Sequence, residues 1–397
     1  MKKKILFVGG GEFQADGIRK AKELGYYSIV IDGNPNAMSS EFADEFYHID
    51  IINREDVLKV AVDRKIDGIA SIASEITMES MSYVATKLDL PGFKYELVQI
   101  AHDKKQYYQK FENASIPVPY TVAYNNNSVL SVLKEKSSYI IKPSKGSGSR
   151  GVKKTSDISS FDFLKYKTEN LQHDEEILIQ EFIEGKELTV DGFIQDGKFF
   201  MLAVSEEMND KAKGHTFSSE LIFPPVWISE GQTDRISELC NNVVKSLDIK
   251  DDGPMHLELI YSPQDVFYII DFSLRGGGFD LFTKIIKKTS GVDALELYLN
   301  SVSGKRSDIP VIRKFNPVSL SFAYSNKSGK LVSIEGYELQ GLYENHFLKF
   351  LCKPGQTVYL PEGGRHRLVY FICWGDNVDS VIDLRDHIRN RIDFIVE

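Results

Sequence analysis

The sequence predicts an α/β protein, with an open, doubly wound parallel sheet at its N-terminal end and a smaller α+β unit in the middle. The first hundred residues alternate short apolar runs with amphipathic stretches, which is typical of βαβ units on a parallel sheet. Two prolines interrupt this pattern in Ile116–Pro119, and a glycine-rich loop follows the strand-like run that ends at Lys142. The chain has 397 residues, more than one hydrophobic core usually supports, so we expect several units that share a cleft.

Composition and charge exclude several classes of protein. Hydrophobic residues make up 42% of the chain and charged residues 26%, the proportions of an ordinary soluble globular protein. The formal net charge of -9 argues against a general nucleic-acid binder, although a local basic cleft for a small anion is compatible with it. We therefore expect small-molecule partners and no nucleic acid.

The sequence also predicts a cytoplasmic protein without a membrane partner. The first apolar run, Ile5–Val8, is far too short for a signal peptide, and no stretch approaches the about 20 apolar residues of a membrane span. Cys240, Cys352 and Cys373 are scattered and form neither a CxxC motif nor a metal-binding spacing, which suits a reducing compartment.

The elements of the N-terminal unit follow from its apolar and amphipathic runs. Apolar runs predict strands, and amphipathic stretches predict the helices between them. The expected strands are Ile5–Val8, Ser28–Ile31 and Ile66–Ser71, and the expected helices are Ala15–Leu24 and Thr77–Leu88. The prolines of Ile116–Pro119 cannot continue a helix, so a boundary between units is expected there.

Downstream of this boundary, the sequence predicts a small lid and then a hairpin. The lid is expected to consist of one short helix, the glycine-rich loop and the strands Tyr139–Ile141, Leu178–Gln180 and Leu188–Val190. Gly253 to Asp271 is predicted to be a β-hairpin, because two alternating runs flank the turn-forming Ser262–Asp265. After about Ser301, further strands such as Pro317–Ser321 and Arg367–Phe371 lead into a final helix.

The first glycine cluster, Gly9–Gly11, resembles a dinucleotide-binding loop but fails its spacing. It follows a strand, and Asp32 at the end of the second strand could hold a ribose hydroxyl. A G-x-G-x-x-G motif needs glycine at position 14, where the chain has Gln14. NAD binding is therefore disfavoured. Two interpretations stay open: the glycines only permit a tight turn, or the loop binds part of a substrate.

The second glycine cluster predicts a phosphate-binding loop. Small, flexible positions interleave with hydroxyls and cations directly after Lys142, a pattern suited to a backbone nest around phosphates. The loop lacks the G-x-x-x-x-G-K-[ST] motif of P-loop proteins, and a flexible surface hairpin would not require Lys142 at the end of the strand. Lys142 would contact the α- or β-phosphate, and Lys104 could approach from the opposite side. The loop residues predicted to bind ATP are Lys145, Gly146, Ser147, Gly148, Ser149 and Gly151.

A strand ending at Ile183 offers an adenine site. Backbone groups of Glu181, Phe182 and Ile183 could pair with the adenine edge, and Glu187 could accept the ribose hydroxyls. The alternative is an ordinary acidic turn, which we would prefer without the neighbouring motifs.

The hairpin brings two carboxylates together. Alternation places His256 and Glu258 on one face of the first strand, and Ile269, Asp271, Ser273 and Arg275 on one face of the second. A turn centred between residues 264 and 265 sets Glu258 opposite Asp271, with Cβ atoms about 5 Å apart. A cation would remove their repulsion, and oxygen ligands that leave room for phosphate favour Mg²⁺ or Mn²⁺.

Arg275 lies on the same face and would offer its planar fork to the γ-phosphate or to a carboxylate under attack. Gly276–Gly278 would let the backbone come close to the substrate. The alternative is a solvated hairpin, which the apolar run Val266–Ile270 makes the poorer interpretation.

Several residues are candidates for contacts with the substrate, although none is convincing alone. The segment from Glu206 to His215 is expected to be a loop that covers the substrate, or else a solvated charged loop. The candidates are Glu75, Glu206, Glu207, Lys211, Lys213, His215, His256, Arg275 and Gly277.

Taken in order, these motifs resemble the ATP-grasp superfamily over essentially the whole chain. The resemblance rests on Asp103-Lys104, Lys142-Pro143 with its loop, Gln180–Ile183, His256–Glu258 and Asp271–Arg275. Phe223–Pro225 and Gly253–Glu258 are similar to the carboxylate–amine ligase branch, which includes L-amino acid ligases.

The resemblance implies an ATP-grasp fold with three domains. These are a Rossmann-like preATP-grasp domain at 1–105, an ATP-grasp domain at 106–300 and a small C-terminal α+β domain at 301–397. Within the second, a mobile lid at about 118–188 would close on ATP over a central antiparallel sheet.

The resemblance also implies a reaction. Such enzymes transfer the γ-phosphate of ATP to a carboxylate, and an amine then displaces phosphate from the acylphosphate. Lys104 and Lys142 would hold phosphates, and Arg275 would stabilise the transferring group. Glu181, Ile183 and Glu187 would bind adenosine, and Glu258 and Asp271 would bind metal. The chain has Asp271-x-Ser273-x-Arg275 where many members have Glu-x-Asn-x-Arg, which bears on the affinity and number of metal ions.

Other functions remain as alternatives. A purine-pathway-like ATP-grasp enzyme would act on a phosphoribosyl substrate or bicarbonate, and a nucleotide-binding module would bind ATP without chemistry. The sequence supports a NAD-dependent oxidoreductase less well than either of these alternatives. The acceptor is not identified by the sequence, and a homodimer stays open.

Overall fold

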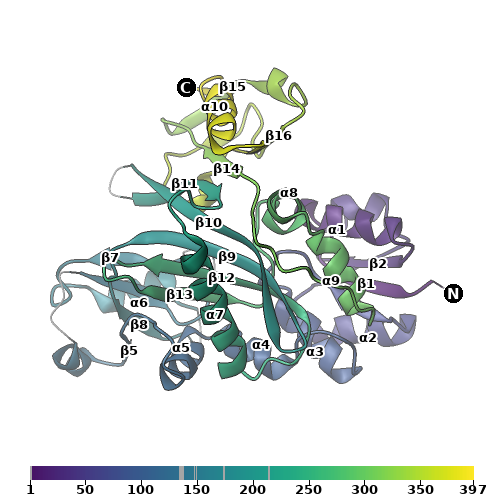
Figure 1. The fold of residues 1–397 in the computed structure, drawn as a ribbon, viewed down its shortest axis with the longest axis horizontal. Helices are drawn as coiled ribbons and strands as arrows, with labels where there is room; N and C mark the ends of the chain where they lie inside the picture. Colours follow the sequence, from purple (N-terminus) through teal and green to yellow (C-terminus); the bar gives the residue numbers. More distant parts are fainter. Residues whose placement is uncertain (1, 134–137, 147, 149, 173–174, 213–214) are drawn as a thin grey trace.

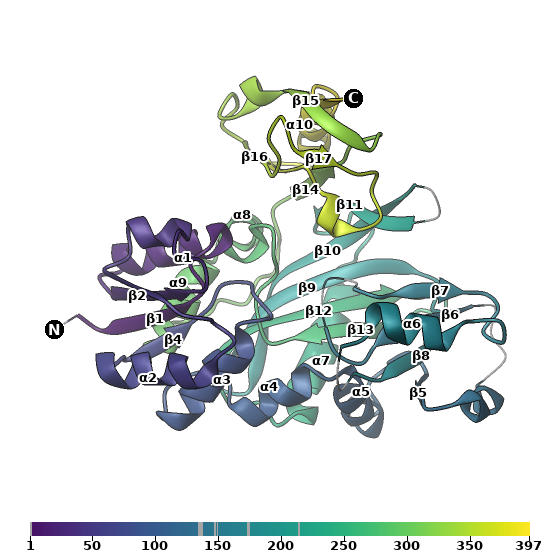
Figure 2. The same cartoon turned by 180° about the vertical axis from the view of Figure 1, so that it is seen from behind.

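A computed structural model describes residues 2–133, 138–146, 148, 150–172, 175–212 and 215–397. In the views of Figure 1 and Figure 2, an N-terminal unit and the predicted lid lie at opposite ends of a long central sheet. The C-terminal residues stand to one side of that sheet, beyond β11. No helix in the described part of the chain combines the length and the apolar character needed to span a bilayer.

The N-terminal unit is a parallel sheet with helices on both faces, as predicted. The strands follow the order β3-β2-β1-β4 and are β1 (Lys4–Val8), β2 (Tyr27–Asp32), β3 (Glu45–His48) and β4 (Gly68–Ala70). Alternate residues of β1 enter different cores: Leu6 packs with α2 (Arg54–Arg64) and α3 (Met78–Lys87), and Phe7 packs with α1 (Glu12–Glu23). Burial on both faces explains why these strands are continuous apolar runs.

Two short helices lead from this unit to the lid. They are α4 (Tyr95–Ala101) and α5 (Lys104–Asn113), and η1 (Met38–Glu41) is a short turn within the first unit. The Asp103 side chain accepts hydrogen bonds from the backbone N–H groups of Lys105 and Gln106, which caps α5 and makes Lys104 its first residue. The predicted domain border between residues 105 and 106 falls within α5. This border remains a prediction.

The lid is a four-stranded antiparallel sheet with one α-helix and one short 3-10 helix among its described residues. The strands follow the order β5-β8-β6-β7 and are β5 (Thr121–Tyr124), β6 (Tyr139–Pro143), β7 (Lys153–Thr155) and β8 (Ile177–Glu181); the helices are η2 (Asn127–Val132) and α6 (Phe163–Asn170). Ile141 and Ile179 pack with Phe163 and Tyr166 of α6 in a separate small core. Assigning Leu188–Val190 to the lid was wrong, because this segment belongs to a strand of the central sheet.

The central sheet has eight antiparallel strands in the order β13-β12-β9-β10-β11-β14-β18-β16. Helix α7 (Glu230–Ser246) packs its apolar side on one face, and the other face carries the polar residues described below. The strands are β9 (Lys186–Gln195), β10 (Lys198–Ala212), β11 (His215–Phe223), β12 (Gly253–Tyr261), β13 (Phe267–Ser273), β14 (Val318–Ala323), β16 (His346–Phe350) and β18 (Val369–Trp374).

The prediction of a loop from Glu206 to His215 was wrong. Residues up to 212 continue β10, and β11 begins at 215. Glu207 pairs with Glu187 on one side and with Leu221 on the other, so it lies inside the sheet. Charged side chains suggested a solvated loop, but cross-strand pairing decides the backbone conformation here.

The C-terminal residues extend the central sheet instead of forming an isolated unit. β14, β18 and β16 continue it, while a small second sheet, β17-β15-β19, packs nearby with helix α10. The predicted border between 300 and 301 falls within α9, which packs on the N-terminal sheet. The remaining elements are η3 (Leu281–Ile285), α8 (Ile286–Ser290), α9 (Ala294–Val302), β15 (Gly329–Glu335), η4 (Tyr337–Leu339), β17 (Thr357–Val358), η5 (Gly364–His366), α10 (Val378–Arg389) and β19 (Asp393–Val396).

Candidate active site

The hairpin of β12 and β13 places Glu258 opposite Asp271, which confirms the predicted pairing. The predicted turn centre was wrong. Beyond Glu258 the register shifts to Leu259 opposite Ile269, so the turn is centred on residue 264 and Ile270 is an extra residue in β13. This β-bulge restores the predicted pairing, because one extra residue shifts the register by one position.

The bulge aims a backbone carbonyl at the lid. The carbonyl oxygen of Ile270 accepts a hydrogen bond from the Tyr108 hydroxyl at 2.5 Å and one from Lys142 Nζ at 3.3 Å. Ile269 N–H in turn donates to the carbonyl of Pro117, next to the start of the lid. The hairpin, α5 and the lid strand β6 are therefore joined at the bulge.

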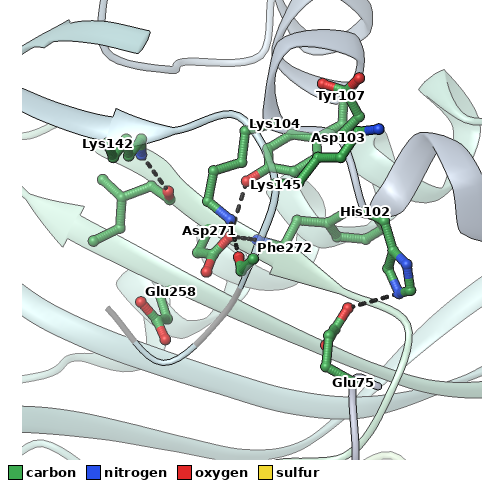
Figure 3. A network of polar contacts seen from close by, with 12 residues as sticks. Glu75, His102, Asp103, Lys104, Tyr107, Lys142, Lys145, Glu258, Asp271 and Phe272 are labelled. Atoms are coloured by element: carbon green, nitrogen blue, oxygen red, sulfur yellow. Dashed lines mark hydrogen bonds and ion pairs between the residues drawn. The ribbon is translucent and has the colours of Figure 1, made fainter. Parts of the chain in front are cut away.

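Asp271 is held by α5. Its Oδ1 accepts a hydrogen bond from the Tyr107 hydroxyl at 2.8 Å and lies 3.2 Å from Lys104 Nζ. Figure 3 shows Lys104 and Tyr107 reaching Asp271 from the same side, with Glu258 on the neighbouring strand. Burial opposes the charge of Asp271, but Lys104 and then Lys142 outweigh it and lower the pKa of this carboxyl. Asp271 is therefore an ionised carboxylate close to Lys104 of α5 and Lys142 of the lid strand β6.

Lys142 is buried at the end of β6 and donates to the Tyr108 hydroxyl at 2.9 Å. Burial and then repulsion from Lys104 lower the pKa of Lys142 from 10.5 to about 7, although Asp271 and Glu258 act in the opposite direction. A group that titrates near neutral pH will become fully charged beside a polyanion.

We expect ATP binding to take up a proton at Lys142. Phosphate groups would raise its depressed pKa, so at pH 8 a non-hydrolysable ATP analogue should bind with uptake of up to about 0.9 proton at this side chain. Affinity should fall as pH rises above 7. Calorimetry in two buffers of different ionisation enthalpy measures the uptake.

The control for this prediction is Lys142→Arg, whose side chain stays charged at every pH used. The analogue's own γ-phosphate also exchanges protons, so the difference between the two proteins is the relevant quantity. Equal uptake in wild type and variant would show that Lys142 is already charged.

The predicted phosphate loop has the backbone that its glycines imply. Gly146 (φ +105°) and Gly151 (φ +71°) are both in the left-handed region, which favours glycine. Lys104 Nζ donates to the Gly146 carbonyl at 2.9 Å, and Lys104 N–H donates to the Ser144 carbonyl, so the loop is anchored to α5. Lys145 and Gly148 are exposed, while Ser147 and Ser149 lie outside the described residues.

The predicted adenine site lies at the hinge between lid and central sheet. The Glu181 carboxylate accepts from Tyr120 N–H at 3.0 Å, and Lys154 Nζ lies 3.2 Å from the centre of the Phe182 ring. Ile183 follows in the same partly buried segment. Glu187 is the second residue of the next strand, β9. Burial and then the charge of Glu258 raise the pKa of Glu187, and Asn209 donates a hydrogen bond to its carboxylate at 2.9 Å. The structure thus brings these residues together where the lid strand β8 leads into β9 of the central sheet.

Arg275 is held by the N-terminal unit. Its Nε donates to Glu75 Oε2 at 2.8 Å, and Glu75 Oε1 lies 2.9 Å from His102 Nε2. Burial opposes the charge of Glu75, but His102 and Arg275 outweigh it and lower the pKa of this carboxyl. Two residues predicted as separate candidates, 200 positions apart, therefore act as a pair.

His256 is paired with Asp191, a residue that the sequence interpretation missed. His256 Nδ1 lies 2.9 Å from Asp191 Oδ2, and Gly277 N–H donates to Asp191 Oδ1 at 2.9 Å. Burial disfavours a charged histidine, but Asp191 outweighs it and raises the pKa of His256 to about 10. Asp191 is 1% exposed and lies among buried apolar residues of β9, so it orients both His256 and the loop after Arg275.

We expect Asp191→Asn to loosen this arrangement. The variant removes the charge that holds His256 and one good acceptor, so the free energy of unfolding should fall by about 1–3 kcal/mol near pH 7. Without metal or nucleotide, the stabilisation from protonated His256 should be complete below pH 6.5 and be lost as pH rises towards 10. Denaturant unfolding from pH 6 to 10 measures this, and the variant should show a flatter profile.

The control is Asp379→Asn, which changes an exposed acid in the first turn of α10. A slope in Asp191→Asn as steep as that of wild type and control would contradict the pairing of His256 with Asp191.

The other substrate candidates differ in position. Glu207 lies on the same face as Glu258, and burial, Glu258 and Glu187 raise its pKa to about 7. Glu206 lies on the opposite face, where it accepts from Trp227 Nε1 at 2.7 Å, so the structure does not bring it into the site. Lys211 is exposed on β10, Lys213 lies outside the described residues, and so does the side chain of His215.

The residues predicted to bind metal fit a divalent cation that also takes phosphate oxygens. Every contact of Asp271 within the described residues uses Oδ1, which leaves Oδ2 for a ligand. The Glu258 side chain is 43% exposed, and the buried Ser273 Oγ has no hydrogen-bond partner there. Within the same residues no three His, Cys, Asp or Glu side chains form a metal cluster, so protein ligands alone would not complete the coordination shell.

The first glycine loop is already satisfied internally. Gly10 N–H donates to Asp32 Oδ2 at 2.7 Å, and the Gln14 side chain covers Gly9. Asp32 therefore holds the loop itself, which agrees with the expectation against a dinucleotide at this position.

Comparison with known proteins gives one family match and a distant relative. Residues 101–272 match the family model described as the ATP-grasp domain. The chain is 25% identical over 325 residues to the carbamoyl phosphate synthase large chain of Clostridium acetobutylicum, an alignment that covers 76% of this chain and 29% of that protein. The chain therefore spans less than a third of the length of this relative.

Solved structures resemble the whole chain, among them an L-amino acid ligase and a biotin carboxylase domain. The L-amino acid ligase from Bacillus licheniformis has a TM-score of 0.83 at 16% identity, with 100% of this chain and 99% of that chain covered. The biotin carboxylase domain of 2-oxoglutarate carboxylase from Hydrogenobacter thermophilus, described in complex with MgADP and bicarbonate, has a TM-score of 0.78 at 16% identity, with 100% and 91% covered. At these identities the likeness concerns the fold. The family match confirms the predicted ATP-grasp domain for residues 101–272, and the likeness to solved structures confirms the predicted fold of the chain. The matches agree with the predicted class of an ATP-dependent ligase.

Proposed function

Because residues 101–272 are an ATP-grasp domain, we propose that the chain is an ATP-dependent carboxylate–amine ligase. It forms an amide or peptide bond through an acylphosphate and releases ADP and phosphate. The observation that carries this proposal is the pairing of Glu258 with Asp271, because cations from the lid and from α5 gather beside this pair.

The polar face suits phosphoryl transfer to a carboxylate. Lys104, Lys142 and the backbone of the glycine loop would hold the phosphates of ATP, while Glu181 to Ile183 and Glu187 would bind adenosine. Glu258, Asp271 and Ser273 would hold Mg²⁺ or Mn²⁺, which when bound would neutralise charge on the transferring phosphoryl group.

The proposed reaction has two steps, formation of an acylphosphate and its attack by the amine. A carboxylate oxygen attacks the γ-phosphorus of ATP, and the bond from that phosphorus to the β,γ-bridging oxygen breaks, which gives an acylphosphate and ADP. The amine nitrogen then attacks the acyl carbon, and phosphate leaves as the amine loses a proton. Arg275 would stabilise the charge of the acylphosphate, and Glu75 fixes the direction of its guanidinium.

A phosphate-release screen tests this function. Purified protein with ATP and Mg²⁺ is crossed with a panel of carboxylic acids and amino acids, and ADP and AMP are measured as alternative products. Phosphate and ADP are expected only when an acid and an amine are both present. AMP as product, or tight ATP binding with no turnover in any combination, would overturn the proposal.

A second function is favoured by one of the solved structures that resemble the chain. The biotin carboxylase domain from Hydrogenobacter thermophilus is described in complex with bicarbonate, so bicarbonate is a second candidate for the carboxylate that receives phosphate. Bicarbonate belongs in the same screen, and ADP formation that needs bicarbonate but no organic acid would favour it.

A phosphoribosyl substrate is less well supported. Such a substrate would need a basic phosphate pocket beside the first glycine loop. The Gly10 N–H is used by Asp32, and the cations Lys349 and Lys284 near this loop are already paired with Glu12 and Asp16 of α1.

A further inference from the structure

Arg367, which lies two residues before β18, is held between two aromatic rings. Its guanidinium carbon lies 3.8 Å from the centre of the Phe322 ring and 4.4 Å from that of Phe279. A Cβ atom added at Gly364 would lie 2.9 Å from Arg367 Nη1, so the backbone packs against the same group. This stacking fixes the plane of the guanidinium while leaving its edge open to a ligand.

The hydrogen-bonding capacity of Arg367 is almost unused. Its one hydrogen bond among the described residues runs from Nε to the Tyr324 hydroxyl at 3.3 Å, and the proton of that hydroxyl is donated to the Ser218 carbonyl. No described carboxylate lies within ion-pair distance of Arg367, whereas Arg275 and Arg385 pair with Glu75 and Glu220. An arginine fork is the side chain best matched to a carboxylate, which is the missing partner here.

Arg367 rests on the same face of the central sheet as Glu258. Cross-strand pairs connect Glu258 through Thr189 to Ser205, and Glu207 follows two residues later on that face of β10. Glu207 pairs with Leu221 and Leu221 with Leu320, so Phe322 also lies on it. One face of the central sheet therefore runs from the carboxylate pair past Glu207 to Phe322, the ring on which Arg367 rests.

Glu207 lies between the two ends of this face. Glu258 raises the pKa of Glu207 and Arg367 lowers it, after burial as the largest cause, so both groups are near enough to act on it. The Gly276–Gly278 loop connects Arg275 directly to Phe279, one of the two rings that hold Arg367. One continuous segment thus links the group proposed to act on the acyl donor with the arginine.

We propose that Arg367 binds the carboxylate of the nucleophile, so that the amine substrate is an amino acid. The carboxylate would pair with the open edge of the Arg367 guanidinium, and the ammonium end would point towards Glu207. An amine without a carboxylate would leave Arg367 unpaired and would bind more weakly. This inference rests on the proposed ligase function and adds the class of nucleophile to it.

The test compares amino acids with their carboxamides as nucleophiles. The acid donor is the one found in the phosphate-release screen, and the nucleophiles are the common L-amino acids, β-alanine and γ-aminobutyrate, each beside its carboxamide. The wild type should prefer the acids. Arg367→Gln should raise the KM for the amino acid about 10–100-fold, the range for hydrogen bonds to charged groups. The kcat, the KM for ATP and the KM for carboxamides should stay within about twofold.

Matched variants separate recognition from folding. Arg365→Gln removes an exposed arginine two residues away and should behave as wild type. Gly364→Ala keeps the charge but displaces the guanidinium, and it should raise the KM for the amino acid even if Arg367→Gln does not fold. Equal use of acids and carboxamides by the wild type, or an unchanged KM in both Arg367→Gln and Gly364→Ala, would overturn the inference.

Binding of the amino acid can also be tested without turnover. In the presence of a non-hydrolysable ATP analogue and Mg²⁺, the amino acids at 10 mM should raise the Tm of the wild type but not that of Gly364→Ala. If the screen finds no ligase activity but this difference is seen, the ligase proposal fails while the carboxylate site stands. If turnover is found but no amino acid raises the Tm of the wild type more than its carboxamide does, the site fails while the ligase proposal stands.

Discussion

Glu258→Gln is expected to lower phosphate release by about 10³-fold or more, because it removes one of two carboxylates that would hold the divalent cation and its phosphate ligands. The side chain is 43% exposed, and its one ion pair among the described residues is with His256 Nε2, at 3.9 Å. The protein should therefore fold normally. The measurement is single-turnover phosphate release with saturating ATP and Mg²⁺, together with the Tm.

Glu335→Gln is the matched control, since it changes an exposed glutamate of β15 far from the hairpin and should leave turnover unchanged. High Mn²⁺ should restore part of the Glu258→Gln activity if metal binding is the property lost. Phosphate release within tenfold of wild type would contradict the metal role of Glu258.

Arg275→Lys is expected to lose about 10²–10⁴-fold in kcat, although the charge is retained. The guanidinium has a planar fork, of which Nε is already used by Glu75 and one Nη1 bond goes to the Gly276 carbonyl. A lysine ammonium could keep the ion pair with Glu75 but could not also present parallel donors to an acylphosphate. Turnover and KM values for ATP and the acid separate the effects.

The control for this change is Arg235→Lys, at an exposed pair with Asp265 on the hairpin turn, which should leave activity unchanged. Glu75→Gln should have a smaller effect, because it disorients Arg275 without removing it. In a double-mutant cycle, the combined loss should be well below the product of the single losses. Independent, multiplying effects would show that Glu75 and Arg275 do not act together.

Much of the site could be predicted because it depends on local periodicity. Side chains alternate between the two faces of a strand, which is enough to place Glu258 on the same face as His256, and Ser273 on the same face as Asp271. The hairpin turn sets the pairing of Glu258 with Asp271. The prediction nevertheless used an incorrect turn centre, and the bulge at Ile270 compensated for it. A bulge is decided by tertiary contacts, here those of the Ile270 carbonyl with Tyr108 and Lys142, which the sequence does not reveal.

The features that the sequence did not predict depend on contacts between distant segments. Asp191 looks like an isolated polar residue in an apolar strand, and its partner His256 is 65 residues away. A buried acid in such a run is itself a signal, since burial of a charge needs a partner. Glu206 to His215 was misjudged for the opposite reason, because its charges suggested solvent, although the cross-strand pairs place Glu207 inside the sheet.

The continuity of the central sheet determines where the chain can be divided. Removal of residues 301–397 would take away β14, and the hydrogen-bonding groups of β11 from Glu220 to Phe223 would lose their partners. An exposed edge that contains Leu221 and Phe223, both buried in the full chain, is a template for aggregation. A shortened fragment that stays in solution would therefore need polar residues that cover the edge of β11. In chimeras that exchange C-terminal segments between homologues, the junction should lie after Trp374, the last residue of β18, so that the central sheet stays intact.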